Sequence, residues 1–264
     1  MNVREEKDVV IDIHSHILPG VDDGAQTVED SLEMAKAAVE DGIHTIIATP
    51  HHQNGKYTNV KENILNKVAD LNKNLEISEI PLTVLPGQET RIHGDMIEGL
   101  QANEILPLTN LGNYVFVEFP SDAVPRYAKQ LLFDIQLEGY QPIIVHPERN
   151  RQIIQHPSLL FDMVSKGAYT QITAASLTGR FGKNIKKFTH QLIEANLTHL
   201  IASDAHNTTS RGFCMTDAYD VLKENYGPSM VYLFAENAEY VVKGDALAAD
   251  SPQPIKKKKF LGIF

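Results

Sequence analysis

Short apolar runs rich in β-branched residues alternate along the chain with longer segments of mixed polarity. Continuous apolar runs of this kind are typical of parallel strands that are buried on both faces of a sheet. They occupy residues 9–13, 45–49, 82–85, 114–119, 142–145, 168–173 and 198–202. The pattern therefore predicts seven strands.

Between these runs, apolar positions recur at helical spacing. Thr27, followed by Asp30, has the arrangement of a capping box that begins a helix, and Gly42, Gly139 and Gly167 stand where helices are expected to end. Further helices are expected at residues 60–74, 125–138, 157–166, 183–195 and 216–225. Repeated strand–helix alternation predicts an α/β protein, either a barrel or a doubly wound sheet.

Length and composition narrow the class of protein. The 264 residues fit one domain of barrel size or two small domains. The chain has 24 Lys+Arg and 34 Asp+Glu, and the resulting net charge of −10 argues against a nucleic-acid binder. No apolar run approaches the roughly 18 residues of a membrane span, and the charged N-terminus lacks the apolar core of a signal peptide. A single cysteine excludes a disulfide framework and a tetrathiolate zinc site. We expect a cytoplasmic protein.

Polar residues with metal-binding side chains follow or end the predicted strands. They are His14 and His16, His51, Glu89, Glu118, His146, and Asp204 with His206. The carboxyl ends of parallel barrel strands point at one mouth, so these side chains are expected to converge. Nitrogen and oxygen ligands suit Zn²⁺, Mn²⁺ or Fe²⁺, and there are too many of them for one ion. The sequence therefore predicts a site for two or three ions.

Several other residues complete the expected site. Arg149 and Arg211 follow proposed ligands, and the planar fork of arginine suits a phosphate group. Asp12 is expected to orient a ligand, and His52 is expected to line the site without binding metal. Cys214 has neither a glycine-rich loop nor an arginine at the spacing of a cysteine-dependent phosphatase, so it is expected to be a structural thiol.

The combined motifs resemble those of the PHP (polymerase and histidinol phosphatase) superfamily. They are Asp12-Ile-His-Ser-His16, Thr49-Pro-His51, Gly87-Gln-Glu89, His146-Pro-Glu-Arg149 and Ser203-Asp-Ala-His206. Residues 12–24 and 146–150 are similar to the bacterial manganese-dependent protein-tyrosine phosphatases of capsule and exopolysaccharide loci. The resemblance implies a distorted (β/α)₇ TIM-like barrel in a single domain, with a catalytic barrel at 10–250, an N-terminal extension at 1–9 and a flexible basic tail at 251–264.

The resemblance also implies three divalent ions, with Mn²⁺ expected and Zn²⁺ or Fe²⁺ compatible with the same ligands. The implied ligands are His14, His16, Glu89 and Asp204 for the first ion, Glu89, Glu118 and His146 for the second, and Asp23, His51 and His206 for the third. Asp22 lies beside Asp23, which leaves the choice between these two carboxylates open. Arg149 and Arg211 are implied to bind the phosphate.

The implied activity is that of a protein-tyrosine phosphatase, in which a hydroxide bridging two ions attacks phosphorus and His206 or water supplies the leaving-group proton. Its expected partner is a bacterial tyrosine kinase that carries phosphotyrosine. The alternatives are a small-molecule phosphatase of the histidinol-phosphate type and a regulatory binding protein without turnover. Lys256, Lys257, Lys258 and Lys259 are candidates for a weak contact with the kinase or an anionic membrane. The oligomeric state stays open.

Overall fold

The computed structural model describes residues 10–255. The strands are β1 (Val10–Ser15), β2 (Ile43–Ala48), β3 (His51–His52), β4 (Thr83–Pro86), β5 (Glu89–Arg91), β6 (Tyr114–Glu118), β7 (Gln141–Val145), β8 (Tyr169–Thr173) and β9 (Leu200–Ala202). The helices are α1 (Val28–Glu40), α2 (Lys61–Ile77), α3 (Met96–Gln101), α4 (Ala128–Leu137), α5 (Arg151–Gln155), α6 (Ser158–Val164), α7 (Ala174–Thr178), α8 (Lys183–Glu194), α9 (Met215–Tyr226) and α10 (Pro228–Lys243). A 3-10 turn, η1 (Pro147–Arg149), follows β7.

The strands pair in parallel and form two sheets, β1-β2-β4 and β3-β5-β6-β7-β8-β9. Pro50 separates β2 from β3 and lacks the N–H group that would continue the ladder. At the other junction, Ser15 at the end of β1 forms a parallel bridge with Ala205, just after β9. Within residues 10–255 no sheet closes on itself, so the closed TIM-like barrel expected from the resemblance is not confirmed; the α/β class is confirmed.

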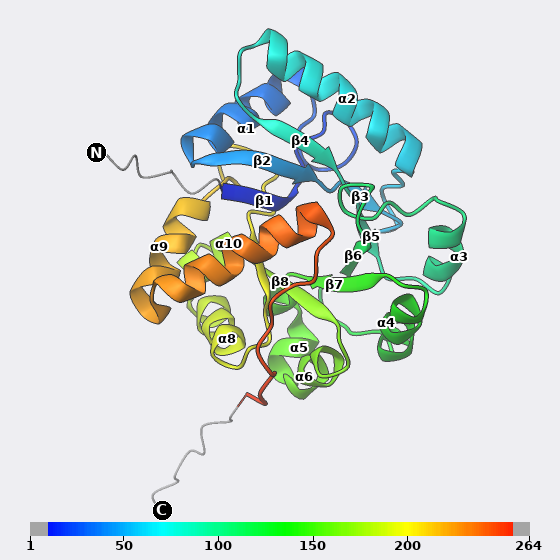
Figure 1. Cartoon of the computed structure of the whole chain (residues 1–264), viewed down its shortest axis with the longest axis vertical. Coiled ribbons are helices and arrows are strands. Elements are labelled where there is room, and N and C mark those ends of the chain that lie inside the picture. The colour runs from blue at the N-terminus through cyan, green and yellow to red at the C-terminus, as the bar shows by residue number, and fades with distance from the viewer. Residues whose placement is uncertain (1–9, 256–264) are drawn as a thin grey trace, which may run out of the picture.

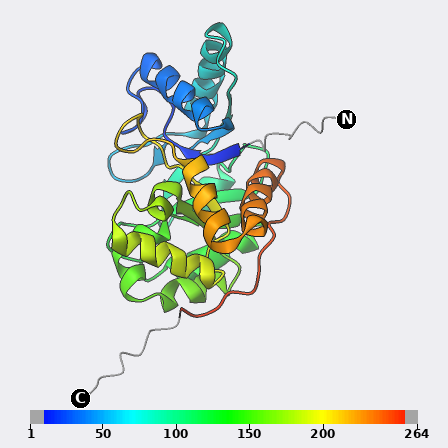
Figure 2. The ribbon, with the colours of Figure 1, turned by 90° about the vertical axis from the view of Figure 1, so that its left-hand side faces the viewer.

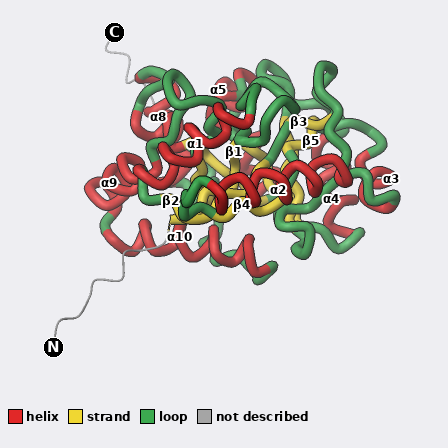
Figure 3. The backbone as a smooth tube through the Cα atoms, turned by 90° about the horizontal axis from the view of Figure 1, so that it is seen from above, coloured by secondary structure: helices red, strands yellow, loops and turns green. Residues whose placement is uncertain are grey.

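Helices cover the outside of both sheets. In Figure 1, α1 and α2 lie beside the three-stranded sheet, whereas α4, α5, α6 and α8 surround the six-stranded sheet. The perpendicular view of Figure 2 separates these two groups of elements, and in Figure 3 the strands occupy the middle with helices around them. Helix α10 packs against β1, β9 and α9.

The buried apolar side chains form a large cluster that includes the helix-packed faces of the strands, and a smaller one that draws on both sheets. The smaller cluster includes Ile13, Ile47, Phe116, Ile143 and Leu200 from the strands and Ala238 and Val241 from α10. The Phe116 ring lies 5.0 Å from the imidazole of His14, measured between centroids. This apolar layer therefore supports the polar residues at the strand ends directly.

Most elements predicted from the sequence are present. Each of the seven apolar runs overlaps a strand, and Thr27 caps α1 with both hydrogen bonds of the capping box to Asp30. Gly42, Gly139 and Gly167 adopt φ values of 82°, 88° and 95°, as glycines that follow helices do. The sequence reasoning missed the short strands β3 and β5 and the helices α3, α5, α7 and α10.

The expected N-terminal extension, residues 1–9, and the four lysines at 256–259 lie outside the described residues. The part of the expected tail that is described, residues 251–255, runs against the domain: Gln253 N donates to the carbonyl of Ala195, and Asn196 Nδ2 donates to the carbonyl of Ser251. Of the helices in residues 10–255, none is both long enough and apolar enough to cross a bilayer.

Candidate metal centre

The structure brings all nine predicted ligands to one place at the carboxyl ends of the strands. His14 lies on β1 and His16 just beyond it, His51 on β3, Glu89 on β5 and Glu118 on β6. The other four lie in loops: Asp23 between β1 and α1, His146 after β7, and Asp204 and His206 after β9. Residues up to 192 positions apart in the chain, His14 and His206, thus form one polar centre, as the strand-end argument predicts.

The first group contains His14, His16, Glu89 and Asp204, all of them buried. Nε2 of His14 lies 3.5 Å from Glu89 Oε2 and 3.5 Å from Asp204 Oδ1. Nε2 of His16 lies 3.4 Å from each of the same two oxygens. Two imidazole nitrogens and two carboxylate oxygens therefore surround one point at nearly equal spacing.

The second group also contains Glu89. Its Oε1 is 2.8 Å from Nε2 of His146, and its Oε2 is 2.8 Å from Nδ1 of His51. Glu118 Oε2 lies 3.7 Å from the same nitrogen of His51. Glu89 thus faces both groups, as a ligand shared between neighbouring ions would.

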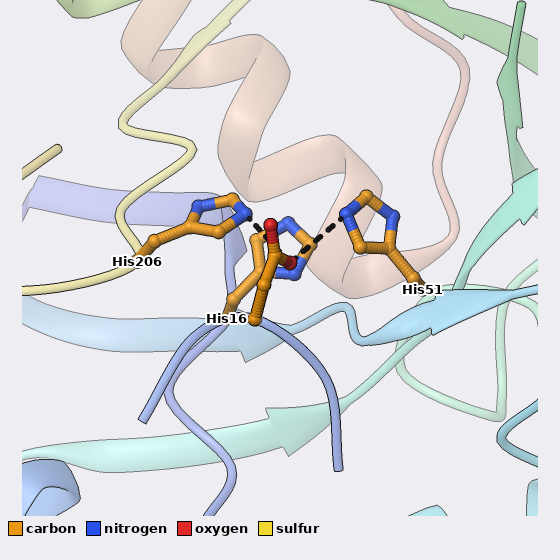
Figure 4. A group of neighbouring side chains, drawn as sticks. His16, His51 and His206 are labelled. Carbon is orange, nitrogen blue, oxygen red and sulfur yellow. Dashed lines mark ion pairs between the residues drawn. The ribbon is translucent and has the colours of Figure 1, made fainter. Parts of the chain in front are cut away.

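The third group is shown in Figure 4, where His51 and His206 approach one carboxylate from opposite sides, in front of the His16 ring. Asp23 Oδ1 is 3.3 Å from Nε2 of His51 and 3.4 Å from Nε2 of His206. Ligand atoms of His16, Asp23, His51 and His206 all lie within 4.8 Å of one another. His16 therefore borders this group as well as the first, and His51 borders the second and the third.

Hydrogen bonds on the far side of each ring orient three of the histidines. Nδ1 of His14 lies 2.9 Å from Gln171 Oε1, and Nδ1 of His16 lies 2.7 Å from Asp22 Oδ2. Nδ1 of His206 lies 3.0 Å from the carbonyl of Asp204. Each partner is an acceptor, so each Nδ1 donates to it and each ring is held with Nε2 toward the centre.

The residues fit metal ions. The buried atoms without a hydrogen-bond partner include Nε2 of His14, His16 and His206. Burying polar atoms unpaired costs about 1–3 kcal/mol each, and here three of them face the same centre. A set of nitrogen and oxygen donors is the kind that Mn²⁺, Zn²⁺ or Fe²⁺ prefers.

Burial and neighbouring charges shift the pKa values of several candidate ligands. Burial alone would raise the pKa of Asp204, but Arg149 and the surrounding imidazoles hold it well below its ordinary value. Burial, with the charge of Arg149, lowers the pKa of His146 to about 4; burial, with His16, lowers the pKa of His206 to about 4. Both rings are therefore neutral at neutral pH, which is the form that binds metal.

The backbone is unusual at two candidate ligands and at one glycine. His146 and Asp204 have φ values of 36° and 52°, in the left-handed region that non-glycine residues seldom adopt. A Cβ atom on Gly24 would lie 2.0 Å from the carbonyl oxygen of His16. Only glycine lets the loop that carries Asp23 pass this close to His16.

Arg149 and Arg211 converge on one carboxylate. Nη2 of Arg149 donates to Asp204 Oδ2 at 2.5 Å, and Nη2 of Arg211 donates to the same oxygen at 3.0 Å. Both guanidiniums line an open cavity of about 320 Å³, which also borders His51, Glu118 and His146. The two oxygens of Asp204 therefore have different partners: Oδ1 faces the histidines and Oδ2 accepts from the arginines.

Sequence reasoning missed three residues here, Gln171, Arg91 and Tyr57, and left the role of a fourth, Asp22, open. Gln171 and Asp22 hold histidine rings, Arg91 forms a bidentate pair with Glu118, and Tyr57 stacks on His51 at 6.2 Å between ring centroids. Of these, Asp22 had a sequence signal in its position beside Asp23, and the structure separates their roles. Asp22 faces His16 Nδ1, whereas Asp23 faces the Nε2 atoms of the third group.

The structure also places three further residues that the sequence analysis singled out. Asp12 accepts from the backbone N–H groups of His14 and Ser203 and from Ser203 Oγ, so it joins β1 to the end of β9 rather than touching a histidine ring. His52 is buried on β3 next to His51. Cys214 is buried, and burial raises the pKa of its thiol to about 11, so it is a poor nucleophile.

Comparison with known proteins gives a consistent result. The family described as "Capsular polysaccharide synthesis, CpsB/CapC" matches residues 10–243. The tyrosine-protein phosphatase YwqE of Bacillus subtilis is 50% identical over 255 residues, which cover 97% of this chain and 100% of YwqE. The putative tyrosine-protein phosphatase CapC of Staphylococcus aureus is 40% identical over 257 residues, which cover 96% and 100%.

A solved structure has the same fold. It is described as one of the crystal structures of YwqE from Bacillus subtilis and CpsB from Streptococcus pneumoniae, "unique metal-dependent tyrosine phosphatases". It superposes with a TM-score of 0.91 and 51% sequence identity, and the match covers 94% of this chain and 100% of that one. These findings confirm the resemblance drawn from the motifs. The chain belongs to the CpsB/CapC family of capsular polysaccharide synthesis.

Proposed function

We infer that this chain is a metal-dependent protein-tyrosine phosphatase. The observation that carries the inference is the convergence of buried imidazole and carboxylate groups beside a cavity lined by two arginines. The relatives that match nearly its whole length are named tyrosine-protein phosphatases. This favours a phosphotyrosine protein substrate over the small-molecule alternative.

We propose three ion positions, in line with the three groups of side chains. His14, His16, Glu89 and Asp204 would hold the first ion, Glu89, Glu118 and His146 the second, and Asp23, His51 and His206 the third. Mn²⁺ is the proposed ion. Bound divalent ions supply a water of lowered pKa and neutralise charge on the phosphate. Glu89 is the ligand shared between the first two positions.

Arg149 and Arg211 are proposed to bind the phosphate. Each guanidinium carries five N–H donors, so both keep donors for phosphate oxygens while they hold Asp204 Oδ2. Their charge also stabilises the negative charge on the equatorial oxygens of the transition state. Asp204 fixes the two guanidiniums relative to its own ligand oxygen, and so fixes the phosphate relative to the ions.

His206 is assigned to ion binding. Its neutral ring donates through Nδ1 to a carbonyl and presents Nε2 to Asp23, which leaves no proton to give. The leaving group is a tyrosine phenolate, and the tyrosine hydroxyl has a pKa of about 10. Such a leaving group is stable enough for water to protonate it. The catalytic role predicted for His206 is therefore proposed to be indirect.

We also propose that the two sheets together form a distorted seven-stranded barrel. In this description, β3 continues β2 beyond Pro50 and β5 continues β4 beyond Gly87, so each interrupted pair counts as one strand of the barrel. The bridge between Ser15 and Ala205 joins the first strand to the last. This arrangement is consistent with ligands that arise from nearly every strand end.

The proposed partner is a bacterial tyrosine kinase that carries phosphotyrosine, as the family's link to capsule synthesis suggests. The cytoplasmic location, the kinase contact of the lysines at 256–259 and the domain boundaries stay predictions from the sequence.

A three-substrate assay tests the function. Purified protein is given phosphotyrosine peptide, histidinol phosphate or phosphoserine peptide, with Mn²⁺ and after removal of metal by a chelator. We expect turnover of the phosphotyrosine peptide that disappears on chelation, returns with Mn²⁺ and is lost in His14→Ala. Cys214→Ser is the matched control and should keep its activity. Preferred turnover of histidinol phosphate, or full activity after chelation, would refute the proposal.

A further inference from the structure

Arg91 is a charged residue of the centre that the proposed mechanism does not use. It lies two positions after Glu89 on β5, and in the parallel register its Cα is paired with that of Glu118 on β6. Residues two apart on a strand share a face, so Glu89 and Arg91 both point toward the ligands. Arg91 therefore stands beside Glu118 at the edge of the centre.

The Arg91 guanidinium holds both oxygens of Glu118. Nε donates to Oε2 at 3.0 Å and Nη2 donates to Oε1 at 2.9 Å. The side chain of Glu118 is only 9% exposed and that of Arg91 is 24% exposed. This is a bidentate, partly desolvated pair, which is among the stronger ion-pair geometries in proteins.

Asp204 provides the contrast. There the arginines bind Oδ2 alone, and Oδ1 stays free to face His14 and His16. At Glu118 the oxygen that faces His51, Oε2, is the same oxygen that accepts from Arg91 Nε. Arg91 also holds the other oxygen, Oε1, so a cation bound by Glu89, Glu118 and His146 would share Glu118 with a guanidinium and lie close to a positive charge.

We propose that Arg91 competes with a cation for Glu118, and thereby keeps the second position, formed by Glu89, Glu118 and His146, the most weakly occupied of the three. This inference rests on the proposed ion positions. Its consequence is that one ion exchanges at concentrations at which the other two stay bound. Arg91 acts through Glu118, so it is a positioning residue and not a catalytic one.

Titration of the metal-free protein with Mn²⁺ tests the proposal, with free Mn²⁺ followed by its electron paramagnetic resonance signal. In the wild type we expect one class of ion weaker than the rest. Arg91→Met and Arg91→Gln should tighten this class by about tenfold or more, since hydrogen bonds to a charged group contribute on that order. General damage to the site would weaken binding, so a gain in affinity is specific to competition.

Two variants serve as controls. Arg180→Met removes an arginine that pairs with Asp217, away from the centre, and should leave every class unchanged. Glu118→Gln should remove the weak class, and adding Arg91→Met to it should then bring no gain. Unchanged or weaker binding in both Arg91 variants, with melting curves that show folded protein, overturns the inference. A wild type that binds no Mn²⁺ refutes the proposed ion positions instead.

Discussion

Asp22 Oδ2 lies 2.7 Å from Nδ1 of His16, and both side chains are buried. The contact fixes the imidazole with Nε2 toward Glu89 and Asp204. Asp22 also accepts from the backbone N–H groups of Gly24 and His51, at 2.9 Å and 3.1 Å. One carboxylate outside the ligand set therefore orients a ligand ring and the backbone of a second ligand.

Asp22→Asn is expected to weaken Mn²⁺ binding by about 10- to 100-fold, the usual effect of losing a carboxylate that orients a metal-binding histidine. The amide is uncharged and a weaker acceptor from Nδ1, so the ring is held less firmly. Mn²⁺ titration of metal-free protein measures the change, with the exposed Glu33→Gln as a control. Affinity equal to that of the wild type would show that His16 needs no such partner.

Arg149 and Arg211 should behave as a coupled pair, because both hold the same oxygen of Asp204. We expect Arg149→Lys and Arg211→Lys each to lower kcat/KM for phosphotyrosine peptide by about tenfold or more, since lysine cannot reproduce the planar fork. The double variant should lose less than the product of the two single losses. Strictly multiplicative losses would mean that the arginines act independently.

Gly24→Ala should disturb the loop that carries Asp23. The added Cβ would lie 2.0 Å from the carbonyl oxygen of His16, so the backbone must move. We expect a loss of about 1–3 kcal/mol in the free energy of unfolding, together with weaker Mn²⁺ binding. Gly94→Ala is the matched control, because a Cβ there meets no atom within 4 Å. A wild-type melting curve and affinity for Gly24→Ala would contradict the structure of this loop.

The strand ends were the predictable part of this centre. Apolar runs precede most of the candidate ligands, which include His14, His16, His51, His146 and Asp204. Parallel strands bring such residues to the same end of the sheet, whatever their separation along the chain. Arg91 gave no comparable signal, because its role depends on the register between β5 and β6. Register is a property of paired strands, and the sequence of one strand does not contain it.

Helix α10 shows why some of the fold was missed. Its buried face includes Asn237, a polar residue that interrupts the apolar stripe, and no side-chain hydrogen bond caps its first residue. In the fold Asn237 is satisfied by backbone groups: its Nδ2 donates to the carbonyls of His199 and Ala248, and its Oδ1 accepts from Ala248 N. One partner, His199, precedes the helix by many residues and the other, Ala248, follows it, so periodicity within the helix could not account for them.

His199 should make the stability of the protein depend on pH. Burial lowers its pKa from 6.5 to about 4, and Nδ1 accepts a hydrogen bond from the backbone N–H of Thr170, so the folded state keeps the ring neutral. The unfolded chain binds the proton more readily than the folded one. The stabilisation is therefore complete above pH 6.5 and is lost as the pH falls toward about 4, by up to about 3 kcal/mol.

Urea denaturation at several pH values between 8 and 4 measures this loss, with a chelator present throughout so that metal release does not contribute. His199→Asn keeps an acceptor near Thr170 but does not titrate, so its stability should fall less steeply below pH 6.5 than that of the wild type. Its stability at pH 8 is expected to be lower by about 1 kcal/mol, because the smaller side chain leaves space in a buried site. Parallel curves for the two proteins across this range would show that His199 is not the group that titrates.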